Sequence, residues 1–409
     1  MTAVCRRTAP RLPAAAMCLV SLIALGACGK PHAGAEPRSP ARAPTPAVSL
    51  TRMPFGALSS GAPVEAVVLT NRHGLSATVI TYGATLQSLR FPDRNGQVAD
   101  LAVGYDDLAG YEATPGYTNV TIGRFANRID GAGFALDGKT YKLSANEGTS
   151  LLHGGAEGWD KRNWAIKAID RGTGKAAVTF TLTSPDGDQG FPGTVTADVT
   201  YELNDDNDLT IRYRATTDKP TVINLTHHGM LNLGGIPATH LATDAELAIE
   251  SDAILPIDGS LIPLAQAMPV AGTPFDFRRA AAVTGRVRMA HPQLAIANGG
   301  IDHNYLLRGG RTATPKLAVT LEDRRSGRAM TISTTEPGMQ VYTGNFLAGK
   351  IAGKGGQHLA KYQAITFEAQ AYPDSPNRPD FPGTRLDPSQ VYRQTTVHHF
   401  YHVKQAGTP

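Results

Sequence analysis

Five short segments of the chain place polar, chemically versatile side chains beside glycines or apolar residues. They contain an Asn-Arg pair at 127–128, His-Gly-Gly at 153–155, two adjacent histidines at 227–228, Asp-His-Asn at 302–304, and a glutamate at 368. Histidine titrates near neutral pH and can act as a general acid or base. Amide and guanidinium groups donate several hydrogen bonds each, so an Asn-Arg pair could grip hydroxyl groups of a ligand.

Glu368 carries the clearest signal of a functional role. It lies in the mostly apolar run 365–371, which is typical of a buried strand. Burial raises the pKa of a carboxyl group toward the range that is useful for a general base. Because a buried carboxylate without a role is costly, we interpret Glu368 as functional.

The other segments also have structural interpretations. From residue type alone, Arg128 is more often an arginine that pairs with a carboxylate, His153 a histidine in a turn, and Asp302 a turn aspartate. Side chains of neighbouring residues in an extended segment face opposite ways, so only one of His227 and His228 can enter a given pocket. This alternation argues against a metal site built by the histidine pair.

The cysteines and a cluster of histidines lie at opposite ends of the chain. All three cysteines precede the main body, which is therefore expected to contain no disulfide, thiolate nucleophile or cysteine-based metal site (Cys5, Cys18 and Cys28). Three histidines near the C-terminus are interpreted as solvated strand-end residues and not as metal ligands (His398, His399 and His402). Motifs of phosphate loops, metalloprotease helices and nucleophile elbows are missing from the sequence.

The elements that must position the five segments are predicted to be short strands. Apolar residues make up 41% of the 409 residues and charged residues 18%, with 43 glycines and 28 prolines. In 194–203 apolar and polar side chains alternate, and the alternation resumes in 209–215 after an Asn-Asp-Asp-Asn turn, which predicts a hairpin with one buried face. Similar runs occur at 65–70, 75–80, 178–183, 316–321 and 330–334. The fold is therefore predicted to be all-β, a large antiparallel β-sandwich. The net charge of +4 comes from scattered residues, so no nucleic-acid partner is expected.

The N-terminus resembles an export signal. Three arginines precede the apolar stretch 14–27, which is too short to span a membrane comfortably. The stretch ends in Leu-Gly-Ala-Cys, similar to a bacterial lipobox, which implies cleavage before Cys28 and lipidation of its thiol. An ordinary signal peptide cut after Ala35 is the alternative. We expect a signal at 1–27, a disordered Pro/Ala-rich tether at 28–52 and one catalytic domain at 53–405. The product would be periplasmic and held at the membrane only through Cys28, or else soluble in the periplasm or secreted.

Taken in order, the five segments resemble the galactose mutarotase (aldose 1-epimerase) family. Segments 81–85, 188–193, 272–278 and 336–345 add to the resemblance, which covers about residues 55–403. The resemblance implies a β-supersandwich and an enzyme that interconverts the α and β anomers of free aldoses such as glucose and galactose. This chemistry requires no redox or electrophilic step, so neither a metal nor an organic cofactor is expected.

The resemblance also implies roles for individual residues. Glu368 corresponds to the general base and His228, not His227, to the general acid. The remaining sugar-binding positions are Asn127, Arg128, His153, Asp302 and Gln340. Met230 stands where members usually have a tyrosine, so a hydroxyl and a ring are lost from the pocket, and the usual preference for galactose and glucose is open.

Three alternatives stay open at this point. Glu368 and Asp302 could be the two carboxyl groups of a glycoside hydrolase. The same pocket could belong to a carbohydrate-binding sandwich without activity, or to a hexose-phosphate epimerase of related fold, which would need further cations. We expect a free monosaccharide as partner and a monomer or homodimer.

Overall fold

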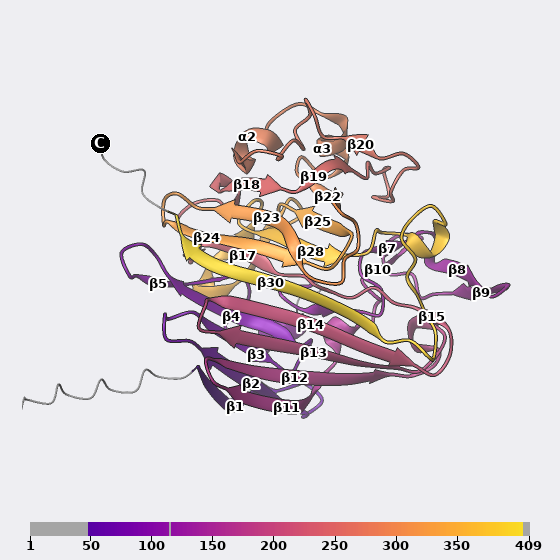
Figure 1. Cartoon of the computed structure of the whole chain (residues 1–409), viewed down its shortest axis with the longest axis horizontal. Coiled ribbons are helices and arrows are strands. Elements are labelled where there is room, and N and C mark those ends of the chain that lie inside the picture. The colour runs from indigo at the N-terminus through magenta and orange to yellow at the C-terminus, as the bar shows by residue number, and fades with distance from the viewer. Residues whose placement is uncertain (1–47, 114–115, 404–409) are drawn as a thin grey trace, which may run out of the picture. The chain divides into compact units, whose positions relative to one another are not determined.

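The computed structural model describes residues 48–113 and 116–403, and antiparallel strands dominate them (Figure 1). The larger sheet has eleven strands. Their spatial order is β1 (Ser49–Ala57), β2 (Pro63–Thr70), β3 (Ser76–Ile80), β4 (Thr85–Pro92), β5 (Val98–Ala102), β17 (Met230–Ile236), β28 (Ile365–Gln370), β25 (Gly338–Tyr342), β22 (Asp302–Leu307), β19 (Ser251–Ile254) and β20 (Met268–Pro269).

The second sheet has nine strands and contains the predicted hairpin. Its order is β11 (Ala165–Gly172), β12 (Lys175–Ser184), β13 (Val195–Asn204), β14 (Asp208–Thr217), β30 (Tyr392–His402), β24 (Arg328–Thr334), β23 (Lys316–Glu322), β18 (Glu246–Ile249) and β21 (Ala281–Ala282).

Small ladders, three short α-helices and six single-turn 3-10 helices complete the described part of the chain. The ladders pair β10 (Leu151–Leu152) with β7 (Arg128–Ile129), β16 (Thr226–His227) with β6 (Thr121–Ile122), β15 (Thr221–Val222) with β29 (Arg385–Leu386), β8 (Gly133–Leu136) with β9 (Lys139–Lys142), and β26 (Ala348–Ala352) with β27 (His358–Ala360). The helices are α1 (Leu108–Ala113), α2 (Val283–Val287) and α3 (Pro292–Ile296).

The alternation read from the sequence is realised in the β13–β14 hairpin. Val199 pairs with Tyr213 and Tyr201 with Ile211 across the two strands. The apolar face of both strands is buried, whereas Arg212 on the opposite face is exposed. The all-β antiparallel prediction is therefore confirmed, since period-two patterning buries one face of each sheet.

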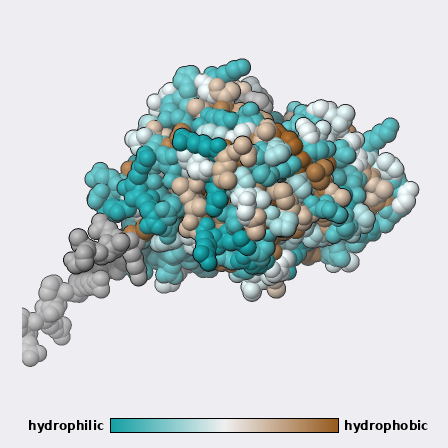
Figure 2. All heavy atoms as spheres, turned by 90° about the horizontal axis from the view of Figure 1, so that it is seen from above, coloured by the Kyte–Doolittle hydropathy of each residue, from teal (hydrophilic) through white to brown (hydrophobic). Residues whose placement is uncertain are grey.

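The two large sheets pack against one core. Phe180 and Val199 of the nine-stranded sheet belong to the same buried cluster as Leu86 and Phe367 of the eleven-stranded sheet. The hydroxyl of Tyr201 donates to the carbonyl of Ala84 across the sheets. The face in Figure 2 is mostly hydrophilic, with hydrophobic residues in small groups.

The structure tests two expectations about the ends of the chain. Val48 is buried and β1 begins at Ser49, so the last five residues of the expected tether (48–52) are ordered, while residues 28–47 and the signal lie outside the described residues. The interpretation of His398 as a solvated strand-end residue is wrong. His398 lies inside β30 and is buried, because it shares the inward face of that strand with Phe400. In the described residues, helices long and apolar enough for a membrane span do not occur.

Candidate active site

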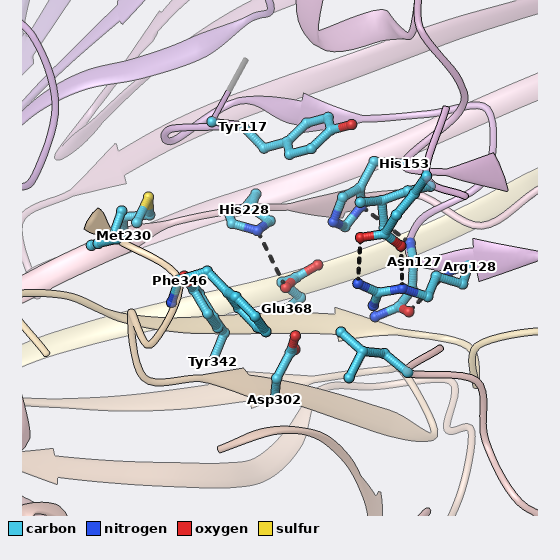
Figure 3. Close-up of a pocket in the computed structure, with 15 residues that line it drawn as sticks. Tyr117, Asn127, Arg128, His153, His228, Met230, Asp302, Tyr342, Phe346 and Glu368 are labelled. Carbon is cyan, nitrogen blue, oxygen red and sulfur yellow. Dashed lines mark hydrogen bonds and ion pairs between the residues drawn. The ribbon is translucent and has the colours of Figure 1, made fainter. Parts of the chain in front are cut away.

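A cavity of about 270 Å³ collects most of the candidate residues of the sequence analysis. Its floor comes from four neighbouring strands of the larger sheet, in the order β17, β28, β25 and β22. Met230, Glu368, Tyr342 and Asp302 rise from these strands into the cavity (Figure 3). Strands that pair in register hold their side chains at fixed distances, so the floor is a rigid platform.

Glu368 sits at the centre of this platform. The whole of β28 is buried, and Glu368 pairs with Gln340 on β25. Gln340 itself does not line the cavity. Its side-chain amide donates to Oδ1 of Asp302 over 2.7 Å, so it orients that carboxylate from behind.

The short β7–β10 ladder supplies the opposite, polar wall. Arg128 pairs with Leu152 in this ladder, which brings Asn127 and His153 side by side. The backbone N–H of His153 donates to the carbonyl of Asn127, and the backbone N–H of Asn127 donates to Nδ1 of His153. Gly154, at φ 86°, passes so close to Gly123 that a side chain there would collide with that backbone.

His228 is the histidine of the pair that enters the cavity. Its Nε2 lies 3.6 Å from Oε1 of Glu368, and both side chains are almost fully buried (Figure 3). His227 points to the other side, into the core beside His398. The prediction that alternation separates the two histidines is confirmed.

Burial shifts the two central groups in opposite directions. Desolvation, with a smaller contribution from Asp302, raises the pKa of Glu368 well above its usual range, and Arg128 opposes this shift. Desolvation lowers the pKa of His228 to about 4. Between about pH 4 and the raised pKa of Glu368 the pair therefore holds one proton, which lies on the carboxyl group when the pocket is empty. One transferable proton between two groups is what concerted acid–base chemistry requires.

His153 is held as a neutral hydrogen-bond donor. Its Nδ1 accepts the Asn127 N–H over 3.2 Å, so the ring proton lies on Nε2. Burial, then the nearby His228 and Arg128, lower the pKa of His153 well below its usual value. His153 can therefore donate to a ligand oxygen but is a poor acid.

The position of the ring proton of His153 decides whether the site could bind a metal ion. His153, His228 and Glu368 offer three ligand atoms that lie within 4.8 Å of one another. A metal-bound histidine donates its second ring N–H to an acceptor. His153 does the reverse, because its second nitrogen accepts a backbone N–H and its free nitrogen carries the proton. The donor set does not fit a metal ion.

Several residues of the site were not found by sequence reasoning. The ring of Tyr117 packs on His153, with ring centroids 4.6 Å apart. The side-chain oxygen of Asn119 accepts the backbone N–H of Met230, and its backbone N–H donates to the carbonyl of His228. Glu147 forms a two-pronged ion pair with Arg128. These residues lie in loops, where the sequence shows no periodicity. The buried Asn119 has a φ of 58°, a conformation in which asparagine is enriched.

The cavity has a polar and an apolar side. Asn127, Arg128 and His153 lie on one side of the central pair, whereas Met230 and Phe346 lie on the other (Figure 3). Half of the Phe346 surface is exposed. A ligand with hydroxyl groups on one edge and carbon on the other matches this division, as in many ligand pockets.

Comparisons with known proteins agree with this geometry. The sequence model of the family described as Aldose 1-epimerase matches residues 65–399. The chain is 38% identical to the galactose mutarotase of Bos taurus over 349 residues, which are 85% of this chain and 98% of the relative. It is 37% identical to the aldose 1-epimerase of Escherichia coli strain K12, covering 83% of this chain and 96% of the relative.

Solved structures support the same assignment. A GalM/aldose epimerase homologue from C. elegans superposes with a TM-score of 0.75 at 32% identity, covering 83% of this chain and 99% of the homologue. A galactose 1-epimerase from Lactobacillus acidophilus superposes with a TM-score of 0.76 at 26% identity, covering 88% of this chain and all of the other. The family match covers most of both large sheets and every residue of the cavity, and the chain belongs to the aldose 1-epimerase family.

Proposed function

We propose that this protein interconverts the α and β anomers of a free aldose, with Glu368 as general base and His228 as general acid. The observation that carries the proposal is the 3.6 Å separation between Nε2 of His228 and Oε1 of Glu368, two buried side chains that both line the cavity. The hydroxyl oxygen and the ring oxygen of a cyclic aldose are both bonded to C1. Two groups at this spacing can therefore reach both oxygens at once.

The reaction opens and recloses the sugar ring. Glu368 takes the proton of the C1 hydroxyl while His228 gives a proton to the ring oxygen, so the C1–O5 bond breaks and an aldehyde forms. After rotation about C1–C2, His228 takes the proton back and Glu368 returns one to the new C1 hydroxyl. Each acid–base contribution accelerates such a step by about 10²–10⁴-fold.

The proton inventory of the pair fits this cycle. Ring opening starts from ionised Glu368 and protonated His228, and it ends with the proton on Glu368 and a neutral His228. Burial favours the second arrangement in the empty pocket, through a raised pKa at Glu368 and a lowered pKa at His228. The buried site thus stabilises the arrangement of protons that accompanies the open-chain aldehyde.

The polar wall would hold the rest of the sugar while C1 turns. Arg128 and His153 present N–H donors, and Asp302 presents an acceptor that Gln340 holds in place. Met230 contributes only apolar surface at the other side. Fixing the hydroxyls restricts motion to the reacting carbon, which lowers the entropic part of the barrier.

Charge in the pocket favours a neutral substrate over a sugar phosphate. Among the described lining residues, Arg128 is the sole lysine or arginine, and its guanidinium is already paired with Glu147. A phosphate would need additional cations or backbone amides. We therefore propose a free hexose such as glucose or galactose as the substrate.

Polarimetry of freshly dissolved α-glucose and α-galactose tests the proposal. The parent enzyme should accelerate mutarotation, Glu368→Gln should nearly abolish the enzymatic rate, and His228→Asn should reduce it strongly. Glu157→Gln and His73→Asn make the same chemical changes at exposed positions outside the cavity and should retain activity. Parental rates in both active-site variants would contradict the assignment, and release of sugar from an aryl glycoside would favour a hydrolase.

We also propose that the protein is exported and anchored through a lipid on Cys28. The support is the apolar stretch 14–27 that follows arginines and ends in Leu-Gly-Ala-Cys. Membrane fractionation of the parent and Cys28→Ser tests it. The parent should sediment with membranes and the variant should not. Equal distribution of the two would favour cleavage after Ala35. The expected monomer or homodimer is checked by light scattering of the purified protein.

A further inference from the structure

Three carboxylates compete for one guanidinium in the active site. The negative charges of Asp302, Glu147 and Glu368 all raise the pKa of Arg128. Among the described residues only Glu147 pairs with it. Nε of Arg128 lies 2.5 Å from Oε2 of Glu147, and Nη2 lies 2.9 Å from Oε1. A two-pronged bond of this kind fixes the plane of the guanidinium as well as its position.

The turn that carries Glu147 is itself held rigidly. Glu147 and Ser150 exchange backbone hydrogen bonds in both directions. The side chain of Asn146 accepts the N–H of Leu152 and donates to its carbonyl, and its amide also reaches the hydroxyl of Tyr117. The carboxylate of Glu147 is therefore presented to Arg128 from a fixed backbone.

We propose that Glu147 is a positioning residue of the active site, which holds the Arg128 guanidinium so that its free N–H groups face the sugar and so that it pairs with neither Glu368 nor Asp302. This inference rests on the proposed function. With Nε and one edge of Nη2 engaged, the donors left for a ligand are on Nη1 and the outer edge of Nη2. Without Glu147, the carboxylates whose charges still act on the buried cation are those of Asp302 and the base Glu368.

The Arg128–Glu147 ion pair should contribute more to activity than to the stability of the fold. Arg128 is 7% exposed, but the side chain of Glu147 is 40% exposed at the rim. Water at the rim screens the charge of Glu147, and the amide oxygen of Glu147→Gln can still accept a hydrogen bond from the buried guanidinium. Glu147→Gln should therefore lower the unfolding temperature only modestly while it lowers activity.

The test compares Glu147→Gln with the parent in mutarotation kinetics. Because a small misplacement of a positioning group costs up to about 10²-fold, we expect kcat/KM to fall by roughly 10–100-fold. The basic limb of the pH profile should also move to lower pH, since a freed guanidinium beside Glu368 stabilises the ionised carboxylate. Glu147→Asp should recover part of the loss, because it restores the charge. Glu157→Gln, an exposed glutamate of the loop after His153, is the matched control and should behave as the parent.

A double-mutant cycle with Arg128→Ala decides whether Glu147 acts through the arginine. If it does, adding Glu147→Gln to Arg128→Ala changes kcat/KM by less than about twofold, because coupled residues are not additive. Additive losses, or an unshifted pH profile in Glu147→Gln, would overturn the inference. Those outcomes leave the proposed function intact as long as Glu368→Gln is inactive. An active Glu368→Gln would instead overturn the proposed function.

Discussion

The backbone N–H of Asn127 donates a hydrogen bond to Nδ1 of His153 over 3.2 Å, and this bond determines which ring nitrogen carries the proton. The donor is part of the main chain and cannot rotate to become an acceptor. Since burial also lowers the pKa of His153 well below its usual value, the neutral ring is favoured, and it donates through Nε2. Two predictions follow from this tautomer.

Replacing His153 by glutamine should be milder than replacing it by leucine. The glutamine amide can still donate to a sugar hydroxyl, whereas leucine leaves that hydroxyl without a partner. A neutral hydrogen bond is worth about 0.5–1.5 kcal/mol and an unpaired buried polar group costs about 1–3 kcal/mol. We expect His153→Leu to lower kcat/KM by roughly ten- to a hundredfold, mainly through KM. Steady-state polarimetry measures both variants, and a leucine variant equal to the glutamine variant would contradict a donor role.

The same tautomer predicts that chelators leave the enzyme unaffected. His153 presents an N–H, not a lone pair, toward His228 and Glu368, so the three groups do not form a metal site. Mutarotation after dialysis against EDTA should equal that before dialysis, and stoichiometric Zn²⁺ should neither activate nor bind tightly by calorimetry. Loss of activity with EDTA and its recovery with one metal would contradict this prediction, because it would show that the His153 ring can flip and coordinate a metal ion.

The fold and the floor of the site could be predicted because they follow from local periodicity. The alternation in 194–203 and 209–215 became β13 and β14, and the apolar run around Glu368 became a wholly buried strand. The same rule would have placed His398 correctly. It lies two residues before Phe400, and residues two apart in a strand share a face.

The parts that escaped prediction depend on contacts between loops. Glu147 meets Arg128 across 19 positions of sequence, and Asn119 meets Met230 across 111. Neither spacing repeats, and an acidic residue in a polar loop is common without any partner. Tyr117 likewise reaches His153 only because its segment and the β10 loop fold together. Nothing in composition or periodicity distinguishes such residues before the chain is folded.

The pH dependence of catalysis should reflect the two opposite shifts at the centre of the site. When pH falls through about 4, His228 gains a proton, the pair then holds two, and no base is left. When pH rises through the raised pKa of Glu368, the pair loses its proton and no acid is left. We therefore expect kcat/KM to follow a bell with its acid limb near pH 4, after subtraction of the buffer rate. An acid limb near 6.5 would mean that His228 is not desolvated in the working enzyme.

His398 should make the fold sensitive to mild acid. It lies with His227 beside a void of about 10 Å³ in the core, and burial lowers its pKa to about 4 from an ordinary value of 6.5. The folded-state pKa is lowered, so the unfolded chain binds more protons between these two values. Stability is full above 6.5 and is lost as pH falls toward 4, by about 1.4 kcal/mol per pH unit for one histidine.

His398→Leu removes the titratable group and replaces it with an apolar side chain of similar size, so this acid sensitivity should disappear. Between pH 7 and pH 5 the parent should lose about 2 kcal/mol more unfolding free energy than the variant. Urea unfolding at both pH values, followed by circular dichroism, measures the difference. His358→Leu makes the same change at an exposed position of β27 and should follow the parent. If the parent and His398→Leu lose stability in parallel, protonation of His398 does not contribute to acid unfolding. The raised pKa values of buried carboxyls such as Glu336 act in the opposite direction but are common to all three proteins, so they cancel in the comparison.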